Sequence, residues 1–418
     1  MRILYISYFY PPLGGPAVLR NVKTVKYLAR MGIECDVITL RDLEYLYRDA
    51  SLLGECAEKR IFRTASLDPM ALVKRARTGG AKKVSGLYMN TPEHIKLWVR
   101  RLYPIDDKIG WNPYLVRAGR KALATADYDF IYVSLGPFSS ALGAYKLSRA
   151  SGIPLVVDLR DYWNLLTDYE LQVSALHRRF SRHWEAKIYR HASLIVTATR
   201  GIGTDAAAAF GKDLADKMIT VYNGWDAGDY QDLPEVEKPD EFTLAYFGNI
   251  YARRSLKHFY AAVKRLREEN LLPANTRIRL YGNFFRETRA EISTSGIDGM
   301  IEIVPQLEHK EALARMQASD VLLLVINSSS PRGTLTSKVF EYLRAGKPIL
   351  AMVPDHKEAA ELLRAHGQDF ICAMESAESI YDCLKRLLIS GQKEYSIPLE
   401  LEREKQIEAL ARRLKSLV

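Results

Sequence analysis

Two ionisable residues, Lys338 and Glu341, stand three apart at the start of a helical pattern, directly after a polar loop. The apolar run at 321–327 predicts a buried strand that delivers the loop at 328–336 to the carboxyl end of a sheet. Free N–H groups at a helix start bind phosphate, a lysine there adds positive charge, and a carboxylate one turn later accepts hydrogen bonds from hydroxyls. A phosphate close to two neighbouring hydroxyls is what the ribose of a nucleotide offers, so these residues predict a nucleotide site. The alternative is that Lys338 and Glu341 are a solvated pair of side chains on one helix, which stabilises that helix by about a few tenths of a kcal/mol.

The loop before that helix supplies the backbone part of the predicted site. Its candidate ligand-facing residues are Gly333, Thr334, Leu335, Thr336 and Ser337. We expect free backbone N–H groups from Gly333 to Ser337, and either Thr336 or Ser337 suits the N-cap position of the helix. The loop therefore predicts an anion site.

The first half of the chain holds two further candidate positions. Gly14 and Gly15 follow the opening apolar run, where glycine lets the backbone approach a phosphate or a sugar closely; an ordinary tight turn is the alternative. Arg160 and Asp161 follow the apolar run "IPLVVDL". Asp161 is suited to orienting an acceptor or a donor sugar, and its alternative roles are a helix cap or a partner for Arg160.

Apolar runs alternate with helical patterns along nearly the whole chain. Continuous apolar strands separated by helices are typical of parallel sheets that are covered on both faces. The alternation stops at a Pro- and acid-rich passage near 226–241 and then restarts, which predicts two doubly wound α/β domains. We place these domains at 1–225 and 226–395. The remainder, 396–418, is predicted to be a charged amphipathic helix that packs back toward the first domain.

The composition is that of an ordinary soluble globular protein, with 418 residues, 48% hydrophobic and 26% charged. Four cysteines lack C-x-x-C spacing, which fits a reducing compartment. No apolar run approaches the roughly 20 residues needed to span a bilayer, and the opening residues read as a buried strand rather than a signal peptide. We therefore expect a cytoplasmic protein.

Basic residues are concentrated in one segment of a chain whose net charge is +10. Between positions 74 and 101, eight Lys or Arg residues accompany a single acid, with aromatic and aliphatic residues interleaved. Such a segment predicts contact with an anionic membrane surface, at the inner face of the membrane; a solvated surface loop is the alternative. No nucleic acid is expected, because no recognisable binding module accompanies the charge.

Three patterns resemble sites of other kinds. "GIGTDA" at 201–206 fits a dinucleotide fingerprint, but it lies at the end of the first domain and "ATR" separates it from its strand. "DYD" at 127–129 imitates a metal clamp, but it precedes its strand and so lies at the wrong end of the sheet. The eight histidines show no ligand spacing, so we expect no bound metal.

The stretch "TSKVFEYLRAGKPIL" resembles the nucleotide-binding segment of GT-B glycosyltransferases of family 4 (glycosyl transferases group 1 / 4-like), with Glu341 and the "GKP" of 346–348 in matching places. Further segments match in family order: "YFYPPLGGPAVLRNVKTVKYLARMGIECDVIT", "IPLVVDLRDYWN", "ITVYNGWD" and "LAYFGNIYARRSLKHF". The resemblance covers nearly the whole chain and rests on the order and spacing of these segments together. It implies the GT-B fold, in which two doubly wound Rossmann-like domains border an interdomain cleft, the first on the acceptor side and the second binding the nucleotide sugar.

The resemblance also implies roles for individual residues. Glu341 would hold the ribose, while Arg254 or Arg253, with Lys338, would meet the donor pyrophosphate. The implied catalytic residues are Asp161, Arg254 and Lys338. The implied donor-binding residues are Gly14, Gly15, Arg160, Gly248, Asn249, Arg253, Gly333, Thr334, Leu335, Thr336, Ser337 and Glu341. Two departures make the donor sugar less predictable: Gly333 stands where the commoner pattern has an acid, and "LRD" stands where many relatives have a His-Asp pair.

The activity that the resemblance implies is a retaining transfer of the hexosyltransferase type, without metal or cofactor. A sugar would move from a nucleotide-diphosphate donor to a saccharide or lipid-linked saccharide, in surface polysaccharide or glycoconjugate biosynthesis. Backbone N–H groups, Arg254 and Lys338 would stabilise charge on the leaving diphosphate. A nucleotide-sugar epimerase on the same fold and a catalytically silent nucleotide-sugar-binding subunit are the alternatives. Turnover of donor, with and without an acceptor, separates the three.

Overall fold

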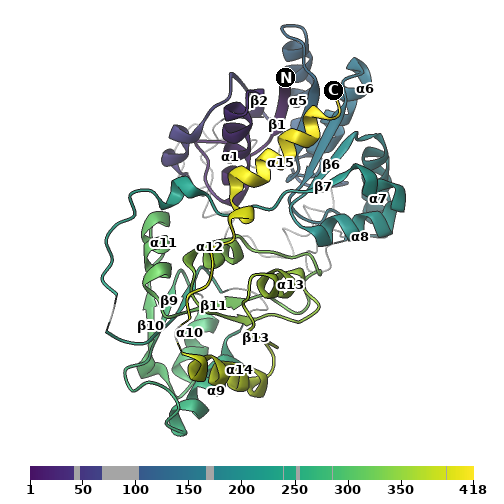
Figure 1. Ribbon diagram of the computed structural model, residues 1–418. Helices are drawn as coiled ribbons and strands as arrows, with labels where there is room; N and C mark the ends of the chain where they lie inside the picture. Colours follow the sequence, from purple (N-terminus) through teal and green to yellow (C-terminus); the bar gives the residue numbers. More distant parts are fainter. Residues whose placement is uncertain are drawn as a thin grey trace, which may run out of the picture. The chain divides into compact units, whose positions relative to one another are not determined.

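The protein is described here by a computed structural model that places residues 1–41, 48–67, 103–165, 174–238, 240–250, 255–284, 286–391 and 393–418. The chain divides into two compact units (Figure 1). Unit 1 is Met1–Tyr222 with Glu404–Val418, and unit 2 is Asn223–Arg403. Each unit is built on one parallel sheet covered by helices, which confirms the predicted fold class of two doubly wound domains. Among the helices in these ranges, none is long and apolar enough to cross a membrane.

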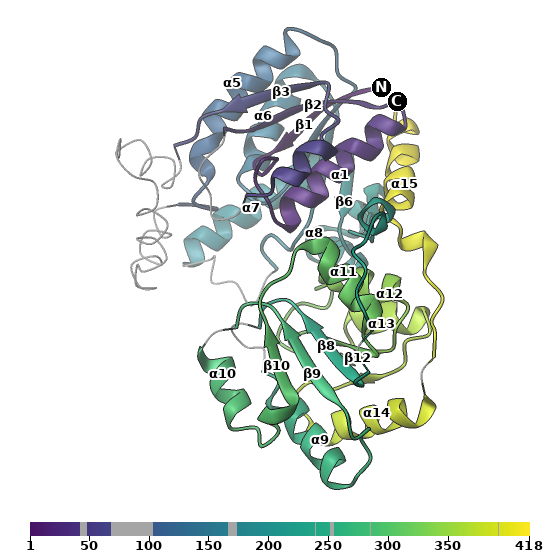
Figure 2. The same cartoon turned by 90° about the vertical axis from the view of Figure 1, so that its left-hand side faces the viewer.

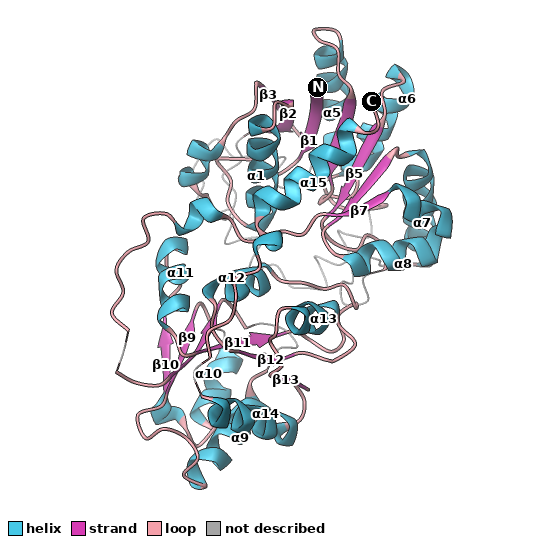
Figure 3. Ribbon diagram, in the orientation of Figure 1, coloured by secondary structure: helices cyan, strands magenta, loops and turns pink. Residues whose placement is uncertain are grey.

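Unit 1 contains a seven-stranded parallel sheet in the order β3-β2-β1-β4-β5-β6-β7. Its strands are β1 Arg2–Ser7, β2 Glu34–Leu40, β3 Arg60–Thr64, β4 Phe130–Ser134, β5 Leu155–Leu159, β6 Leu194–Thr197 and β7 Met218–Thr220. Its helices, drawn in Figure 3, are α1 Pro16–Arg30, α5 Asn112–Leu123, α6 Ser140–Ser151, α7 Ala175–His191, α8 Arg200–Phe210 and α15 Arg403–Lys415. The strand order reverses between β1 and β4, and doubly wound folds bind ligands at such a switch point.

Alternation along the strands of unit 1 builds an apolar layer on each face of the sheet. In β1, Leu4 and Ile6 face the layer under α5, α6, α7 and α8, whereas Ile3 and Tyr5 face the layer under α1. The second layer also receives side chains of α15, namely Ile407, Leu410, Ala411 and Leu414. The carboxyl-terminal helix thus completes the core of unit 1.

Unit 2 contains a six-stranded parallel sheet in the order β10-β9-β8-β11-β12-β13. Its strands are β8 Thr243–Phe247, β9 Arg277–Tyr281, β10 Ile301–Val304, β11 Val321–Val325, β12 Ile349–Met352 and β13 Ile371–Cys372. Its helices are α9 Lys257–Glu268, α10 Arg286–Ser293, α11 His309–Ala318, α12 Ser337–Ala345, α13 Glu358–Ala365 and α14 Ala377–Ser390. Figure 2 shows α9 and α14 side by side, and both contribute to the one apolar cluster that covers a face of this sheet. The strand order reverses between β8 and β11.

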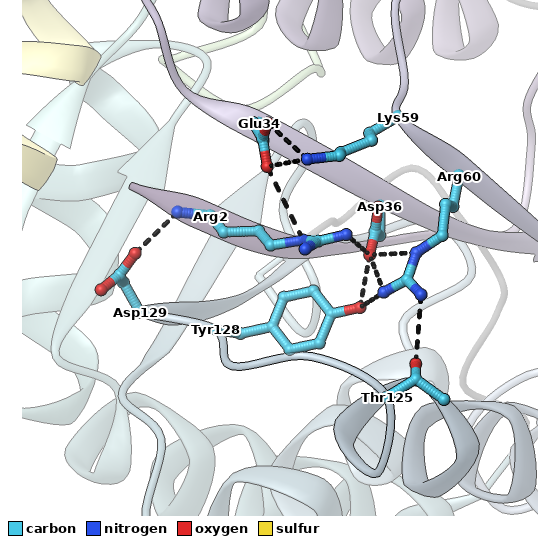
Figure 4. A network of polar contacts seen from close by, with 8 residues as sticks. All are labelled: Arg2, Glu34, Asp36, Lys59, Arg60, Thr125, Tyr128 and Asp129. Carbon is cyan, nitrogen blue, oxygen red and sulfur yellow. Dashed lines mark hydrogen bonds and ion pairs between the residues drawn. The ribbon is translucent and has the colours of Figure 1, made fainter.

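A buried carboxylate holds the amino ends of the unit 1 strands together (Figure 4). Asp36 accepts hydrogen bonds from Arg2 Nη2 at 2.9 Å, from Arg60 Nη2 at 2.7 Å and from Tyr128 OH at 2.5 Å. Burial alone would raise the pKa of Asp36, but the donors, Arg60 foremost, hold it below the usual value. The neighbouring Asp129 accepts the backbone N–H of Arg2 at 2.6 Å. The "DYD" motif therefore serves as scaffold just before β4, and the prediction that it lies at the wrong end of the sheet is confirmed.

The "GIGTDA" pattern at 201–206 lies inside α8 rather than in a loop before it. Thr199 caps this helix, and its hydroxyl accepts the backbone N–H of Ile202 at 3.3 Å. Gly201, Ile202, Gly203 and Ala206 of the pattern are buried on the side of α8 that packs in unit 1, and Gly203 faces Thr197 of β6. The pattern is thus explained by packing rather than by a phosphate-binding loop.

Candidate functional site

The residues predicted in unit 2 meet at its switch point, between β8 and β11. Gly248 directly follows β8, and the loop at 326–336 leads from β11 into α12. These two strands are hydrogen-bonded neighbours, with Val321 opposite Leu244. Because both strands run in the same direction, their loops emerge at the same edge of the sheet. The strand order therefore brings together two loops that lie far apart in the sequence.

The ammonium group of Lys338 lies directly against the backbone of Gly248. A Cβ at Gly248 would come within 2.6 Å of Lys338 Nζ, and the glycine has a φ of +112°. Lys338 Nζ donates a hydrogen bond to Tyr246 OH at 3.0 Å and lies 4.3 Å from the centre of that ring. Tyr246 is fully buried, so its ring and hydroxyl hold the Lys338 ammonium in a fixed position at the end of β8.

The start of α12 presents unused hydrogen-bond donors. Thr336 occupies the N-cap position, as predicted, but its side chain makes no capping bond. Among the residues that the structure places, no acceptor takes the backbone N–H groups of 335–338, whereas Thr334 donates to the carbonyl of Pro331 at 3.1 Å. The predicted run of free donors at 333–337 is therefore wrong at Thr334. Together with the Lys338 ammonium, the N–H groups of 335–338 form a candidate anion site.

Glu341 lies one turn further along α12, and its carboxylate faces His309. The distance from Glu341 Oε1 to His309 Nε2 is 3.2 Å, and the side chains are 19% and 47% exposed. The histidine begins α11, directly after the loop that follows β10. The carboxylate is therefore held in position by a neighbouring helix, yet it stays open enough to accept hydroxyl donors.

Charged side chains from the next βα connection anchor the loop before α12. Lys357 is buried, and its Nζ donates to the carbonyl of Ser330. Arg332 forms an ion pair with Glu361 of α13. These two links hold the loop in place before it reaches the N–H groups of α12. Such anchoring preorganises the anion site, because the loop need not be ordered by the ligand.

The loop after β8 carries three of the predicted donor-binding residues. Arg253 and Arg254 lie outside the described residues. The Oδ1 atom of Asn249 accepts the backbone N–H of Asn283 at 2.8 Å, and its carbonyl accepts the hydroxyl of Tyr246 at 3.2 Å. Asn249 therefore joins the loops after β8 and β9 and supports the backbone beside Gly248.

In unit 1 the loop after β1 runs through Gly14 and Gly15 into α1. Gly15 is the N-cap residue of α1 and has a φ of +101°, a conformation that favours glycine. A Cβ at Gly15 would meet no atom within 4 Å, so its surroundings leave room for a ligand. The side-chain amide of Asn21 fixes this loop by donating to Phe9 O at 3.0 Å and to Ser7 Oγ at 2.5 Å.

Arg160 and Asp161 follow β5 at the same edge of the unit 1 sheet. Arg160 donates from Nε to Leu135 O at 2.6 Å and from Nη2 to Gly136 O at 2.9 Å, so its guanidinium holds the loop after β4. Burial lowers the pKa of Arg160, and the charge of Asp161 opposes this shift. Loss of hydration next to the surrounding protein raises the pKa of Asp161, and the positive charge of Arg160 opposes that rise. Because the Asp161 side chain is exposed, water limits the rise, and this carboxylate is available to a ligand.

A buried carboxyl group fastens the segment after Asp161 to α7. Glu185 accepts hydrogen bonds from Asn164 Nδ2 at 2.5 Å and from Tyr189 OH at 2.8 Å. In the same segment, Trp163 Nε1 donates to Ser181 Oγ of α7 at 2.9 Å. Burial raises the pKa of Glu185 to about 7, and its hydrogen bonds oppose that rise only in part. The clamp on this segment therefore contains a group that titrates near neutral pH.

Replacing Glu185 by glutamine should stabilise unit 1 at pH 8 and leave its stability at pH 4 nearly unchanged. The folded-state pKa is raised from 4.5 to about 7, so folding favours the neutral carboxyl. The stabilisation of the folded state by the neutral Glu185 carboxyl is fully present below about pH 4.5. It is lost as the pH rises through 7, and this loss is at most about 3 kcal/mol. Glutamine keeps the shape without the charge, so we expect Glu185→Gln to gain about 1–2 kcal/mol at pH 8.

Urea unfolding followed by tryptophan fluorescence measures this effect, because Trp111, Trp163 and Trp184 all lie in unit 1. Glu408→Gln on the surface of α15 is the control, and it should leave the pH dependence of the unfolding free energy as it is in the wild type. An equal pH dependence in the wild type and in Glu185→Gln would contradict the expectation.

Two residues of the unit 2 site were not predicted from the sequence. Tyr246 had a detectable signal, since a tyrosine inside a buried apolar strand must find a hydrogen-bond partner for its hydroxyl. His309 had no signal in the sequence, because the contact between α11 and α12 arises only when the chain is folded. In the ranges that the structure describes, no three His, Cys, Asp or Glu side chains gather into a group that could hold a metal ion.

Two family models match the sequence, one in each half. Residues 17–224 match a model described as a glycosyl transferase 4-like domain, and residues 241–390 match a model described as glycosyl transferases group 1. A search of curated proteins finds no significant sequence match.

Solved structures share the fold over the whole chain. HepE from Anabaena, in complex with UDP and glucose, is 15% identical with a TM-score of 0.59, and the alignment covers 100% of this chain and 97% of HepE. Sucrose-phosphate synthase from Thermosynechococcus elongatus is 14% identical, with a TM-score of 0.61 and coverage of 100% and 98%. UDP-GlcNAc 2-epimerase from Neisseria meningitidis, bound to UDP-GlcNAc, is 12% identical, with a TM-score of 0.58 and coverage of 100% of both chains. At these identities the likeness shows the fold alone.

The family matches and the two parallel sheets lead to one assignment. A glycosyl transferase 4-like domain followed by a group 1 domain accounts for most of the sequence. The chain belongs to the GT-B glycosyltransferases of the group 1/4-like type.

Proposed function

We propose that the protein is a retaining glycosyltransferase that moves a sugar from a nucleoside diphosphate to a hydroxyl of a saccharide or lipid-linked saccharide. The observation that carries this proposal is the cluster at the start of α12, where the N–H groups of 335–338 and the Lys338 ammonium precede Glu341 by one turn. The donors suit a diphosphate, and the carboxylate suits ribose hydroxyls. UDP in the HepE structure and UDP-GlcNAc in the epimerase structure support uridine donors as the first to test.

In the proposed reaction, the bond between the anomeric carbon and the diphosphate oxygen breaks while an acceptor hydroxyl oxygen bonds to the same face of that carbon. The diphosphate leaves with the electron pair and takes up the hydroxyl proton. Negative charge therefore grows on the diphosphate, where fixed N–H groups and the Lys338 ammonium stabilise it without reorganisation. Arg253 and Arg254 are proposed to add positive charge there, and Asp161 to orient the acceptor or the donor sugar.

We further propose that the acceptor is presented at the inner face of a membrane, as in surface polysaccharide or glycoconjugate biosynthesis. This proposal rests on the basic and aromatic composition of 74–101. That segment lies outside the described residues, so binding of charge-reversed variants to anionic lipid vesicles is the test of its role.

Replacing Glu341 by alanine should weaken nucleoside diphosphate binding by about 10- to 150-fold, because a hydrogen bond to a carboxylate contributes about 1.5–3 kcal/mol. Calorimetric titration with UDP, GDP, TDP and NADH, on the wild type and on Glu341→Ala, measures this effect. We expect one nucleoside diphosphate to bind the wild type tightly and to lose affinity in the variant. That ligand also names the class of the donor.

The control for this titration is Glu268→Ala, which removes an exposed carboxylate from α9 of the same unit and should leave affinity unchanged. Full affinity in Glu341→Ala, or binding of NADH alone, would show that the nucleotide site has been misplaced.

Donor turnover decides between transfer and the two alternatives on this fold. Release of nucleoside diphosphate that rises when saccharide acceptors are added supports transfer. Conversion of the nucleotide sugar to an epimer without any acceptor would instead favour an epimerase, whose fold this chain shares. Tight donor binding without turnover under either condition would favour a nucleotide-sugar-binding subunit.

A further inference from the structure

The outer side of α7 combines apolar and basic side chains that the core does not use. Leu176 is 75% exposed and Phe180 is 40% exposed. They belong to a stripe whose members recur every three or four residues and so share one side of the helix. This α7 stripe consists of the exposed residues Leu176, Arg179, Phe180, His183, Lys187 and Arg190. The opposite side of the helix is buried in unit 1 and is formed by Ser181, Glu185, Ile188 and Tyr189.

The α7 stripe carries positive charge without any acid to balance it. The one acidic residue of the helix, Glu185, is buried on the other side. In the part of the chain that the structure describes, no ion pair joins Arg179, Lys187 or Arg190 to a carboxylate. The ammonium of Lys187 lies 4.9 Å from the centre of the Trp184 ring, which holds this cation at the surface of the helix. The stripe is therefore a cationic surface with a large apolar component at its amino-terminal end.

The buried side of α7, opposite the stripe, is bonded to the segment that follows Asp161. Trp163 and Asn164 of that segment donate hydrogen bonds to Ser181 and Glu185 of α7. Side chains of the segment and of the first turns of α7 also line a shared hollow, formed by Pro104, Ile105, Phe138, Trp163, Asn164, His177 and Ser181. The helix that carries the α7 stripe is thus fastened to the segment that directly follows Asp161, the carboxylate that we propose to orient the acceptor or the donor sugar.

We propose that the α7 stripe (α7 is labelled in Figure 1) docks the protein on an anionic membrane surface. Leu176 and Phe180 enter the boundary between headgroups and acyl chains, and the basic residues of the stripe contact lipid phosphates. Basic residues alone would suit any polyanion, including nucleic acid or an acidic protein. The apolar pair decides for lipid, because an exposed leucine and phenylalanine among cations gain most where an apolar phase lies under a charged surface. The proposal rests on neither the donor site nor the segment 74–101.

Sedimentation of the full chain with lipid vesicles tests the proposal. We expect the wild type to bind phosphatidylcholine–phosphatidylglycerol vesicles at least about tenfold more tightly than vesicles of phosphatidylcholine alone. The variant Arg179→Glu/Lys187→Glu/Arg190→Glu should lose at least about tenfold in affinity, and Leu176→Ser/Phe180→Ser at least about fivefold. An unchanged melting temperature and far-UV circular dichroism in the variants show that they remain folded, since all substituted side chains are exposed. Tryptophan fluorescence does not serve here, because Phe180 and Lys187 both contact the ring of Trp184.

The matched control is Arg117→Glu/Arg120→Glu/Lys121→Glu, which makes the same change in net charge at exposed positions of α5 in the same unit. Its affinity should stay within about threefold of the wild type, because only charges close to the membrane contribute strongly. Equal losses from the α5 and α7 triple variants would overturn the proposal, as would full binding by Leu176→Ser/Phe180→Ser.

Two further measurements distinguish docking by the α7 stripe from docking by 74–101 and from binding of nucleic acid. A variant in which Lys74, Arg75, Lys82 and Lys83 are replaced by glutamate should retain part of the binding, because the α7 stripe remains intact. If that variant lost all binding while both α7 variants kept theirs, docking would belong to 74–101 and the proposal would fail. Binding of a single-stranded oligonucleotide as tight as binding of anionic vesicles, and insensitive to Leu176→Ser/Phe180→Ser, would assign the stripe to nucleic acid instead.

Discussion

Replacing Lys338 by methionine should lower kcat for sugar transfer by about 100- to 1,000-fold, the loss expected when one preorganised donor to a developing negative charge is removed. Methionine keeps the length of the side chain but removes the ammonium that lies against Gly248 and donates to Tyr246 OH. The N–H groups of 335–338 remain and continue to hold the ground-state diphosphate. We therefore expect KM for the donor to rise by less than about tenfold, so that most of the loss appears in kcat.

Release of nucleoside diphosphate from the donor identified by calorimetry measures this effect. Lys264→Met, which removes an exposed ammonium from α9 of the same unit, is the control and should keep the wild-type rate. Tyr246→Phe should give an intermediate loss of about three- to tenfold, because it leaves the ring under the cation but removes the hydroxyl that fixes it. A kcat within about threefold of the wild type in Lys338→Met would remove Lys338 from the proposed chemistry.

Local features of the site followed from the sequence because they depend on neighbours along the chain. The apolar run at 321–327 predicted β11, and Thr336 takes the predicted N-cap position before α12. The helix ends at Gly346 with a φ of +67°, where the "GKP" sequence supplies a glycine for the left-handed turn and a proline before β12. Burial of the strands on both faces also made the doubly wound class predictable, since strands of parallel sheets between helices give nearly continuous apolar runs that alternate with helical patterns.

Contacts that depend on the order of strands could not be read in this way. Glu341 meets His309 because α11 packs against α12, and the residues between them give no sign of that contact. Arg160 turns its guanidinium to the carbonyls of Leu135 and Gly136, which requires β4 and β5 to be neighbours. The α7 stripe could not be predicted either. The helical pattern of this segment is basic on most sides, so its outward side is known only once the packed side is known. The sequence thus encodes the elements of the site locally, and their mutual contacts arise from the topology.

The largest loss of stability is expected in unit 1 from Asp158→Asn. Asp158 on β5 is fully buried and pairs with Arg20 of α1, whose side chain is 6% exposed. Arg20 donates from Nη2 to Oδ1 at 2.8 Å and from Nε to Oδ2 at 3.2 Å, and its Nη1 donates to the carbonyl of Val221 at 3.0 Å. Removing one charge of such a pair leaves the other buried without compensation, so the free energy of unfolding should fall by about 3–5 kcal/mol.

Urea unfolding followed by tryptophan fluorescence tests this expectation against a surface pair of the same unit. Lys59 and Glu34 are about half exposed, so Glu34→Gln should leave the unfolding free energy close to that of the wild type. Replacing both buried partners, as Arg20→Met/Asp158→Leu, should recover most of the loss, because apolar side chains of similar volume need no charge compensation. If the double variant were no more stable than Asp158→Asn, the loss would come from the shape of the site rather than from an uncompensated charge. Since Arg20 joins α1 to β5, and α1 begins at the glycine loop, this buried pair ties the helix after that loop to the strand that precedes Asp161.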